Sequence, residues 1–274
     1  MTNARSPLAA RQPRPFRMLA ALACLVALAA AGCSSRGTGT QEPPAAASPR
    51  TTPAPAVTAP PTSADGPVSL GDAFAYAAIA HGDVTVRAKP AGGRRLVHLP
   101  ATLPWGTPTP FLVREARRAG GKLWYQVLLP MRPNESTGWV AASQVRTAPR
   151  SYGAQVDLSE RRLTLYRGAD AVRTFAVAIG QPDTPTPTGR FFVTVKLRPP
   201  QVSRFYGAWA LGLSAYSEVL DQFGTGDGQI ALHGTNNGAD LGQAVSHGCV
   251  RLSNPSISTL ARLLPPGSPV DIRP

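Results

Sequence analysis

Hydrophobic and polar positions alternate with a period of two through much of this chain. Between residues 68 and 148 the alternation is carried by short segments that Pro and Gly turns separate, at 84–87, 95–99, 124–129 and 137–140. A period of two is typical of half-buried β-strands, and helical periodicity is confined to residues 71–81. The pattern predicts a mainly β protein that begins with a small antiparallel barrel.

The C-terminal part, residues 151–274, continues the β pattern. Residues 155–158 and 162–166 alternate around a three-residue turn, which is typical of a hairpin. Two further strands are expected at 173–179 and 190–196. Residues 180–189, rich in Pro and Thr, can only form the loop between them.

One clear helix is predicted after these strands. Asn254 offers an N-cap and Pro255 suits the first helical position. Ile257, Leu260 and Leu264 then recur at helical spacing until prolines end the pattern.

The first 32 residues have the features of an export signal. Arginines precede an uncharged apolar run at 18–31, which is shorter than the roughly 18 residues of a spanning helix. The small residues 30–32 then precede Cys33, and this sequence resembles a bacterial lipobox. We expect Cys33 to become the acylated N-terminus of an exported protein, anchored in the cell membrane and facing the cell wall. Ala30 stands where the lipobox prefers Leu, so cleavage without lipidation stays open.

Residues 33–67 are expected to be a disordered tether. They consist mainly of Pro, Ala, Ser and Thr and offer few large apolar side chains for a core. The expected organisation is therefore a signal peptide at 1–32, a tether at 33–67, a β domain at 68–148 and a second β domain at 151–274.

The net charge of +13 argues for no particular partner. The excess is spread along the chain as arginines, without a Lys/Arg block or an aromatic-basic alternation. Nucleic-acid binding is therefore not expected.

Cysteine usage singles out one thiol. Cys24 and Cys33 lie in the export segment, so Cys249 would be the only free thiol of the exported protein, with no disulfide partner. A buried, inert cysteine is the alternative interpretation. The neighbouring residues favour reactivity.

The segment 246–251, Ser-His-Gly-Cys-Val-Arg, places His247 beside this cysteine, and His233 lies 16 residues before it. Only the thiolate attacks carbonyls, so cysteine enzymes keep an imidazole within hydrogen-bond reach of the thiol. The pattern indicates a nucleophilic cysteine with a histidine base. A structural zinc site normally needs four ligands, so no metal or other cofactor is expected here.

With the hairpin, the Pro-Thr-Gly loop, His-Gly-Thr at 233–235 and the 246–251 segment in this order, residues 151–273 resemble the L,D-transpeptidase catalytic domain of the YkuD type. The spacer of 13 residues between the two histidines is at the short end for that family. Residues 124–127 and 138–140 resemble, more loosely, a bacterial Src-homology-3-like domain. The first resemblance implies a β-sandwich with short helices, whose cleft receives peptidoglycan stem peptides.

The same resemblance implies roles for the motif residues. Cys249 is the nucleophile that forms a thioester and releases D-alanine. His233 is the base, and His247 shapes the pocket and assists the thiolate. Backbone N–H groups at 247–249 stabilise the oxyanion. The residues expected in oxyanion and substrate binding are Gly248, Ser246, Arg251 and Gly234.

The implied activity is peptidoglycan L,D-transpeptidation, which forms 3→3 cross-links in cell-wall biogenesis and maintenance of cell shape. Carbapenems are expected to acylate the same cysteine. Water as acceptor would make the protein an L,D-carboxypeptidase or endopeptidase, and a protein lysine would make it an anchoring enzyme. A vestigial site would leave a non-catalytic wall-binding lipoprotein. The sequence leaves the acceptor, the residue at stem position three, the ligand of the first β domain and the oligomeric state open.

Overall fold

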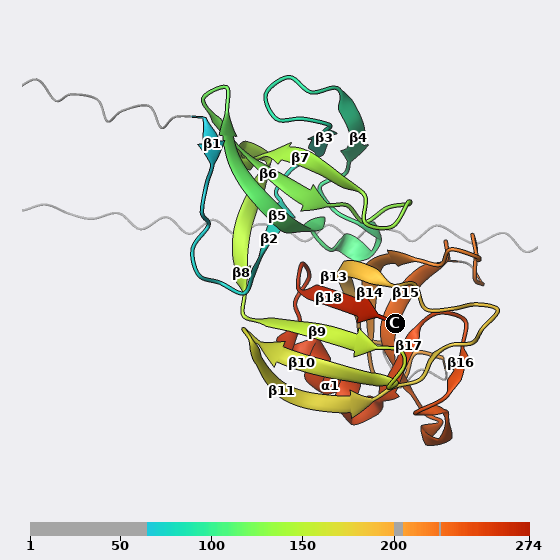
Figure 1. Ribbon diagram of the computed structural model, residues 1–274. Helices are drawn as coiled ribbons and strands as arrows, with labels where there is room; N and C mark the ends of the chain where they lie inside the picture. Colours follow the sequence, from blue (N-terminus) through green and yellow to red (C-terminus); the bar gives the residue numbers. More distant parts are fainter. Residues whose placement is uncertain (1–64, 200–204, 225) are drawn as a thin grey trace, which may run out of the picture. The chain divides into compact units, whose positions relative to one another are not determined.

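The computed structural model describes residues 65–199, 205–224 and 226–274. The predicted signal peptide, the predicted lipid-attachment residue Cys33 and all but the last three residues of the predicted tether lie outside the described residues. The described residues belong to one compact unit, which contains two large β-sheets and, among these residues, one α-helix (Figure 1). The prediction of a mainly β protein is confirmed. Among the described residues, no helix has the length and apolar character needed to cross a membrane.

The N-terminal sheet has the strand order β4-β3-β7-β6-β5-β2-β8, with β1 paired to β5. Its pairings are antiparallel. On β3 alternate residues, Val84 and Val86, enter the core of this domain. The strands are β1 Gly66–Pro67, β2 Ala75–Ala80, β3 Val84–Arg87, β4 Arg95–Leu99, β5 Pro110–Ala119, β6 Lys122–Leu128, β7 Thr137–Ala141 and β8 Val145–Arg150. Short 3₁₀ turns occur at Pro104–Gly106 and Ala142–Gln144.

Two details of this domain go beyond what the sequence pattern indicates. The stretch 71–81, where the pattern has a helical period, contains the strand β2, which is paired on both sides, with β5 and β8. Folded structure also begins before Val68: β1 pairs with β5, and the Asp65 carboxylate accepts a hydrogen bond from Gly120 N.

The C-terminal sheet has the order β11-β10-β9-β18-β13-β14-β15-β17. The β9–β18 and β15–β17 pairs are parallel and the other pairs are antiparallel. The short strands β12 and β16 form a separate two-stranded parallel sheet. The strands are β9 Tyr152–Asp157, β10 Arg162–Arg167, β11 Asp170–Ala176, β12 Ile179–Gly180, β13 Gly189–Leu197, β14 Ala210–Tyr216, β15 Gln229–Thr235, β16 Ala244–Ser246, β17 Val250–Ser253 and β18 Pro269–Arg273.

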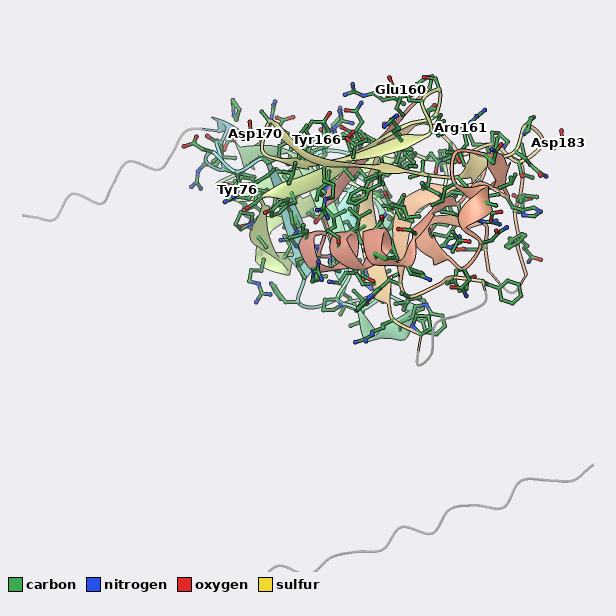
Figure 2. All side chains as sticks on the ribbon, turned by 90° about the horizontal axis from the view of Figure 1, so that it is seen from below. Tyr76, Glu160, Arg161, Tyr166, Asp170 and Asp183 are labelled. Carbon is green, nitrogen blue, oxygen red and sulfur yellow. The ribbon has the colours of Figure 1, made fainter. Side chains whose placement is uncertain are left out.

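The predicted hairpin is confirmed as β9–β10. Its turn is closed by Asp157, whose carboxylate accepts hydrogen bonds from Ser159 Oγ at 2.7 Å and Glu160 N at 2.8 Å. Glu160 and Arg161 lie at the outer end of this turn (Figure 2). The Arg161 guanidinium donates to the carbonyl oxygen of Gly242 at 3.1 Å, so the hairpin also contacts the segment that leads to the motif cysteine.

The predicted helix is α1, Asn254–Leu263, with its cap one residue earlier than expected. Ser253 is the N-cap, and its hydroxyl accepts a hydrogen bond from Ser256 N at 3.3 Å. Ile257 and Leu260 are fully buried against β14, β15 and β17. The helix therefore covers the strands that carry the histidine and cysteine motifs.

The two β domains share a buried apolar contact. Phe192 of β13 packs with Leu112 of β5 and Leu128 of β6, and each is at most 1% exposed. The partly buried Arg150 donates to the carbonyl oxygen of Pro266. The domains are therefore joined by core packing and by hydrogen bonds.

Candidate active site

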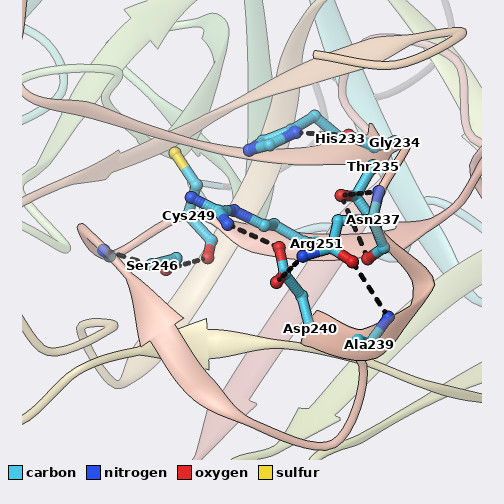
Figure 3. Close-up of polar contacts among 10 residues, drawn as sticks. His233, Gly234, Thr235, Asn237, Ala239, Asp240, Ser246, Cys249 and Arg251 are labelled. Carbon is cyan, nitrogen blue, oxygen red and sulfur yellow. Dashed lines mark hydrogen bonds and ion pairs between the residues drawn. The ribbon is translucent and has the colours of Figure 1, made fainter. Parts of the chain in front are cut away.

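The parallel pairing of β15 with β17 brings the two sequence motifs together. The register pairs Leu232 with Val250 and His233 with Arg251. Leu232 and Val250 are fully buried in the core, so alternation turns His233 and Arg251 to the opposite face. Cys249 precedes Val250 and therefore shares that face. One pair of strands thus presents the predicted nucleophile, the predicted base and an arginine on the same side (Figure 3).

His233 is buried and has a defined tautomer. Its Nδ1 lies 2.8 Å from the carbonyl oxygen of Gly234, and a carbonyl can only accept, so Nδ1 carries the proton. Nε2 of the neutral ring is then free to accept one. Burial, with a smaller contribution from the nearby charge of Arg251, outweighs the opposing Gly234 hydrogen bond and lowers the pKa of His233 from its ordinary value of 6.5 to about 4. The ring is therefore neutral at pH 7.

Cys249 is a free thiol that is partly exposed. Burial raises the pKa of the Cys249 thiol, whereas a backbone hydrogen bond from Ala231 and the charge of Arg251 lower it. The burial effect is the largest, so the resting pair is a neutral thiol beside a neutral imidazole. A thiol in this state must lose its proton before or during any attack on a carbonyl.

The turn that carries Cys249 is closed by Ser246. The buried Ser246 hydroxyl donates to the carbonyl oxygen of Cys249 at 2.5 Å and accepts from Gly248 N at 3.1 Å. These two hydrogen bonds hold the backbone at Gly248 and at Cys249, the predicted nucleophile. Because Gly248 N–H donates to Ser246, this N–H is engaged within the turn.

The Pro- and Thr-rich loop, residues 180–189, packs directly on this turn. Thr186 Oγ1 donates to Gly248 O at 2.8 Å and accepts from Gly180 N at 2.8 Å. Thr184 Oγ1 donates to the carbonyl oxygen of Ser246 at 3.2 Å. In the sequence this loop is recognisable only as one of the motifs shared with the family. The structure makes it the support of the cysteine turn.

Two motif glycines are required for local packing. Gly248 has φ +110°, and a Cβ there would lie 2.8 Å from Ile230 Cδ1. At Gly234 a Cβ would lie 2.3 Å from Asn254 Oδ1. The backbone angle of Gly248 and the neighbouring Ile230 therefore exclude a side chain at this position, whether or not a substrate is bound.

Arg251 pairs with Asp240, a residue that sequence analysis missed. Arg251 Nη1 lies 2.8 Å from Asp240 Oδ2, with the side chains 27% and 17% exposed. Both residues line a cavity of about 380 Å³, together with Phe205, Thr235, Asn236 and Asn237. The only sequence signal for Asp240 was its place in the spacer between the two histidines.

His247 differs from the other motif residues because it is exposed. Its ring lies against the Phe223 ring, with the centroids 4.9 Å apart and the planes inclined by 33°. Tyr206 makes an edge contact of 5.4 Å with His233. Neither aromatic residue was singled out from the sequence. Within the described part of the chain, no group of three or more His, Cys, Asp or Glu side chains is placed to hold a metal ion.

Comparison with known proteins gives a consistent result. The family model of the YkuD L,D-transpeptidase catalytic domain matches residues 151–272. YkuD of Bacillus licheniformis, which carries an L,D-transpeptidase name, is 34% identical over 156 residues, covering 54% of this chain and 86% of the relative. The Bacillus subtilis protein of the same name is 35% identical over 121 residues, covering 44% of this chain and 65% of the relative.

Among solved structures, L,D-transpeptidase 3 from Mycobacterium tuberculosis, in complex with a faropenem-derived adduct, aligns with 15% identity and a TM-score of 0.39. The alignment covers 56% of this chain and 91% of that structure.

Proposed function

Because the chain belongs to the YkuD family of L,D-transpeptidases, we propose that it is a cysteine acyltransferase that forms 3→3 cross-links between peptidoglycan stem peptides. The observation that carries the proposal is the β15–β17 register, which sets Cys249 on the same face as a neutral His233 with a free Nε2. A thiol and an unprotonated imidazole on one face are the parts that acyl transfer requires.

The first half-reaction makes a thioester. His233 Nε2 takes the thiol proton as Cys249 Sγ attacks the carbonyl carbon between stem residue three and the terminal D-alanine. The tetrahedral intermediate collapses, the C–N bond breaks, and the leaving amine of D-alanine takes the proton from His233. Free D-alanine and an acylated cysteine result.

The second half-reaction makes the cross-link. The side-chain amine of residue three on another stem attacks the thioester carbonyl and gives its proton to His233. The C–S bond then breaks, and the sulfur recovers the proton as the amide forms. With water in place of the amine, the product would be a shortened stem peptide with a free carboxylate.

We assign the oxyanion to the backbone N–H groups of His247 and Cys249. Gly248 N–H belongs to the predicted set as well, but it donates to Ser246 Oγ in the resting site. Donors of this kind contribute about 10²–10³-fold each to acyl transfer. Ser246 and Thr186 keep them in place through the contacts of the turn.

Arg251 and Gly234 have positioning roles in this proposal. Arg251 is held by Asp240 at the wall of the 380 Å³ cavity, where its positive charge faces an anionic group of the stem peptide. The Gly234 carbonyl oxygen accepts a hydrogen bond from His233 Nδ1, and the absence of a side chain at Gly234 leaves room for Asn254.

For the location of the protein, we propose export and attachment to the membrane through a lipid on Cys33, with the catalytic domain facing the wall. The support is the sequence pattern of residues 1–67. Globomycin, an inhibitor of lipoprotein signal peptidase, should cause precursor to accumulate, and so should Cys33→Ala. Normal release of a mature Cys33→Ala protein would overturn the lipid anchor.

Carbapenems provide a second test of whether Cys249 is the nucleophile. Their strained ring presents a carbonyl carbon that Cys249 Sγ can attack as in the first half-reaction, so that the ring C–N bond breaks, the ring nitrogen takes the proton and Cys249 becomes acylated. Intact mass should show one adduct on the wild-type protein and none on Cys249→Ala. An unmodified wild-type protein would count against the nucleophilic role of Cys249.

The deciding experiment incubates residues 58–274 with a disaccharide-tetrapeptide and reads the products by mass spectrometry. Cys249→Ala and His233→Gln serve as matched controls. A dimer that has lost one D-alanine, formed only by the wild type, is the expected result. Tripeptide without dimer would make water the acceptor, and no product from any protein would leave a wall-binding role.

A further inference from the structure

A loop of the N-terminal β domain forms hydrogen bonds with the segment that joins β14 to β15 in the catalytic domain. We call this segment the 217–228 loop; its residue 225 lies outside the described residues. The Arg132 guanidinium donates from Nη1 to Asp227 O at 2.8 Å. From Nη2 it donates to Ser217 O at 3.1 Å and Leu220 O at 2.9 Å. One side chain therefore ties the beginning of the loop to its end.

Neighbouring contacts hold Arg132 in this position. Its guanidinium lies over the Tyr216 ring, 4.7 Å from the centroid, and the Tyr216 hydroxyl donates to Pro130 O at 3.1 Å. Asn134 Nδ2 donates to Tyr216 O, and Asn134 Oδ1 accepts from Tyr216 N, both at 2.9 Å. Asn134 thus pairs with the last residue of β14 much as a neighbouring strand would.

The 217–228 loop reaches the catalytic motif through Phe223. This side chain is 54% exposed, and its ring lies against His247, two residues before the nucleophile. Phe223 and Gly226 exchange two backbone hydrogen bonds of 3.0 Å, which shape the tip of the loop. The place of Phe223 beside His247 therefore depends on how the ends of the loop are held.

We propose that Arg132 is a positioning residue that holds the 217–228 loop, and with it Phe223, as a wall of the stem-peptide site. The N-terminal β domain then belongs to the catalytic unit. The inference rests on the proposed function for the identity of the substrate. An arginine suits this task because its fork of five donors serves three carbonyl oxygens at once. A lysine ammonium is a point charge without that fork.

The test compares Arg132→Ala and Arg132→Lys with the wild type, and uses Arg146→Ala as a control. Arg146 is an exposed arginine of the same domain. Hydrogen–deuterium exchange of the 217–228 loop should rise about tenfold or more in Arg132→Ala, because three hydrogen bonds to a charged group are lost. KM for the tetrapeptide should rise about tenfold, with a smaller change in kcat. Arg132→Lys should recover only part of both effects.

Two further readouts separate positioning from loss of fold. The rate at which iodoacetamide alkylates Cys249 should stay within twofold of the wild-type rate, because the β15–β17 pairing holds that thiol. Phe223→Ala should raise KM as Arg132→Ala does, and the double variant should add little. Unchanged exchange in Arg132→Ala, or a KM that moves only together with the melting temperature, would overturn the proposal. If the wild type turns over no peptide, the proposed function fails, while exchange still decides whether Arg132 holds the loop.

Discussion

The Thr186 hydroxyl donates a 2.8 Å hydrogen bond to the carbonyl oxygen of Gly248, the residue before the proposed nucleophile Cys249. It also accepts a 2.8 Å hydrogen bond from Gly180 N, and both contacts are buried. A side chain that lies 63 positions before Cys249 in the sequence thus supports its backbone. The Pro- and Thr-rich loop is therefore part of the active-site scaffold.

Thr186→Val should weaken this scaffold without changing its volume much. The Gly180 N–H and the Gly248 carbonyl oxygen would each lose a partner, and an unsatisfied buried group costs about 1–3 kcal/mol. We expect the free energy of unfolding to fall by about 2 kcal/mol and kcat to fall while KM stays nearly constant. Urea denaturation and steady-state kinetics measure the two effects.

Thr164→Val is the matched control, since Thr164 is a half-buried residue of β10 whose hydroxyl shares a solvent-exposed hydrogen bond with Thr174. It should change the free energy of unfolding by less than about 0.5 kcal/mol. Equal losses in the free energy of unfolding for the two variants would mean that the buried Thr186 hydrogen bonds stabilise the fold no more than the Thr164 contact does.

Protonation of His233 should lower both the free energy of unfolding and the kcat of the protein at acid pH. The unfolded chain binds this proton with a pKa near 6.5 and the folded chain with a pKa of about 4. Between these values the unfolded state holds more protons, so the free energy of unfolding rises with pH through that window, by up to about 3 kcal/mol. In the wild type kcat should fall as pH drops toward 4, where the base becomes protonated.

His233→Gln removes this titration. Its free energy of unfolding should be flatter than that of the wild type between pH 4 and 6.5, as measured by denaturation at several pH values. In the wild type, alkylation of Cys249 should keep accelerating above pH 9, because burial raises the pKa of the thiol. An alkylation profile that levels off well below pH 9 would indicate a preformed thiolate instead.

The Arg251–Asp240 pair should contribute more than an exposed pair. Its side chains are 27% and 17% exposed, whereas those of Arg117 and Glu115 are 46% and 34% exposed. Water and salt screen exposed pairs, whose coupling is commonly 0.2–1 kcal/mol. We expect a double-mutant cycle of Arg251→Gln and Asp240→Asn to give a coupling of about 1–3 kcal/mol that persists in high salt.

The cycle of Arg117→Gln and Glu115→Gln provides the comparison. Its coupling should stay below about 1 kcal/mol and shrink as salt is added. Equal couplings for the two pairs would show that partial burial does not strengthen the Arg251–Asp240 contact.

The sequence could predict the parts of this protein whose signals are local. The β9–β10 hairpin has a clear alternation and turn, α1 has a Pro at its start and a helical apolar stripe, and the cysteine motif carries its own chemistry. The structure agrees with the hairpin and the helix. The roles of the motif residues, the Src-homology-3-like resemblance and the lipid anchor stay predictions.

The features that could not be predicted depend on contacts distant in sequence. Alanines favour helices, yet β2 is a strand because it is paired on both sides. Its Ala77 also lies close to Gly267, where an added Cβ would be 2.3 Å from Ala77 Cβ. Arg132 acts on carbonyl oxygens 85 to 95 positions away. Nothing in the local sequence distinguishes it from the other arginines of the N-terminal domain.

Gly248→Ala should disturb the nucleophile turn for two separable reasons. The φ of +110° is unfavourable for a residue with a Cβ, and that Cβ would meet Ile230 Cδ1 at 2.8 Å. We expect a loss of about 1–3 kcal/mol in the free energy of unfolding and a large loss of kcat. Ile230→Val removes the Cδ1 atom, so the double variant should recover the part caused by the clash and keep the part caused by the backbone angle.

Gly238→Ala is the control, because nothing lies within 4 Å of a Cβ there, and it should stay within about 0.5 kcal/mol of the wild type. Full recovery in the double variant would mean that the backbone angle costs nothing, and no recovery would mean that Ile230 moves aside freely.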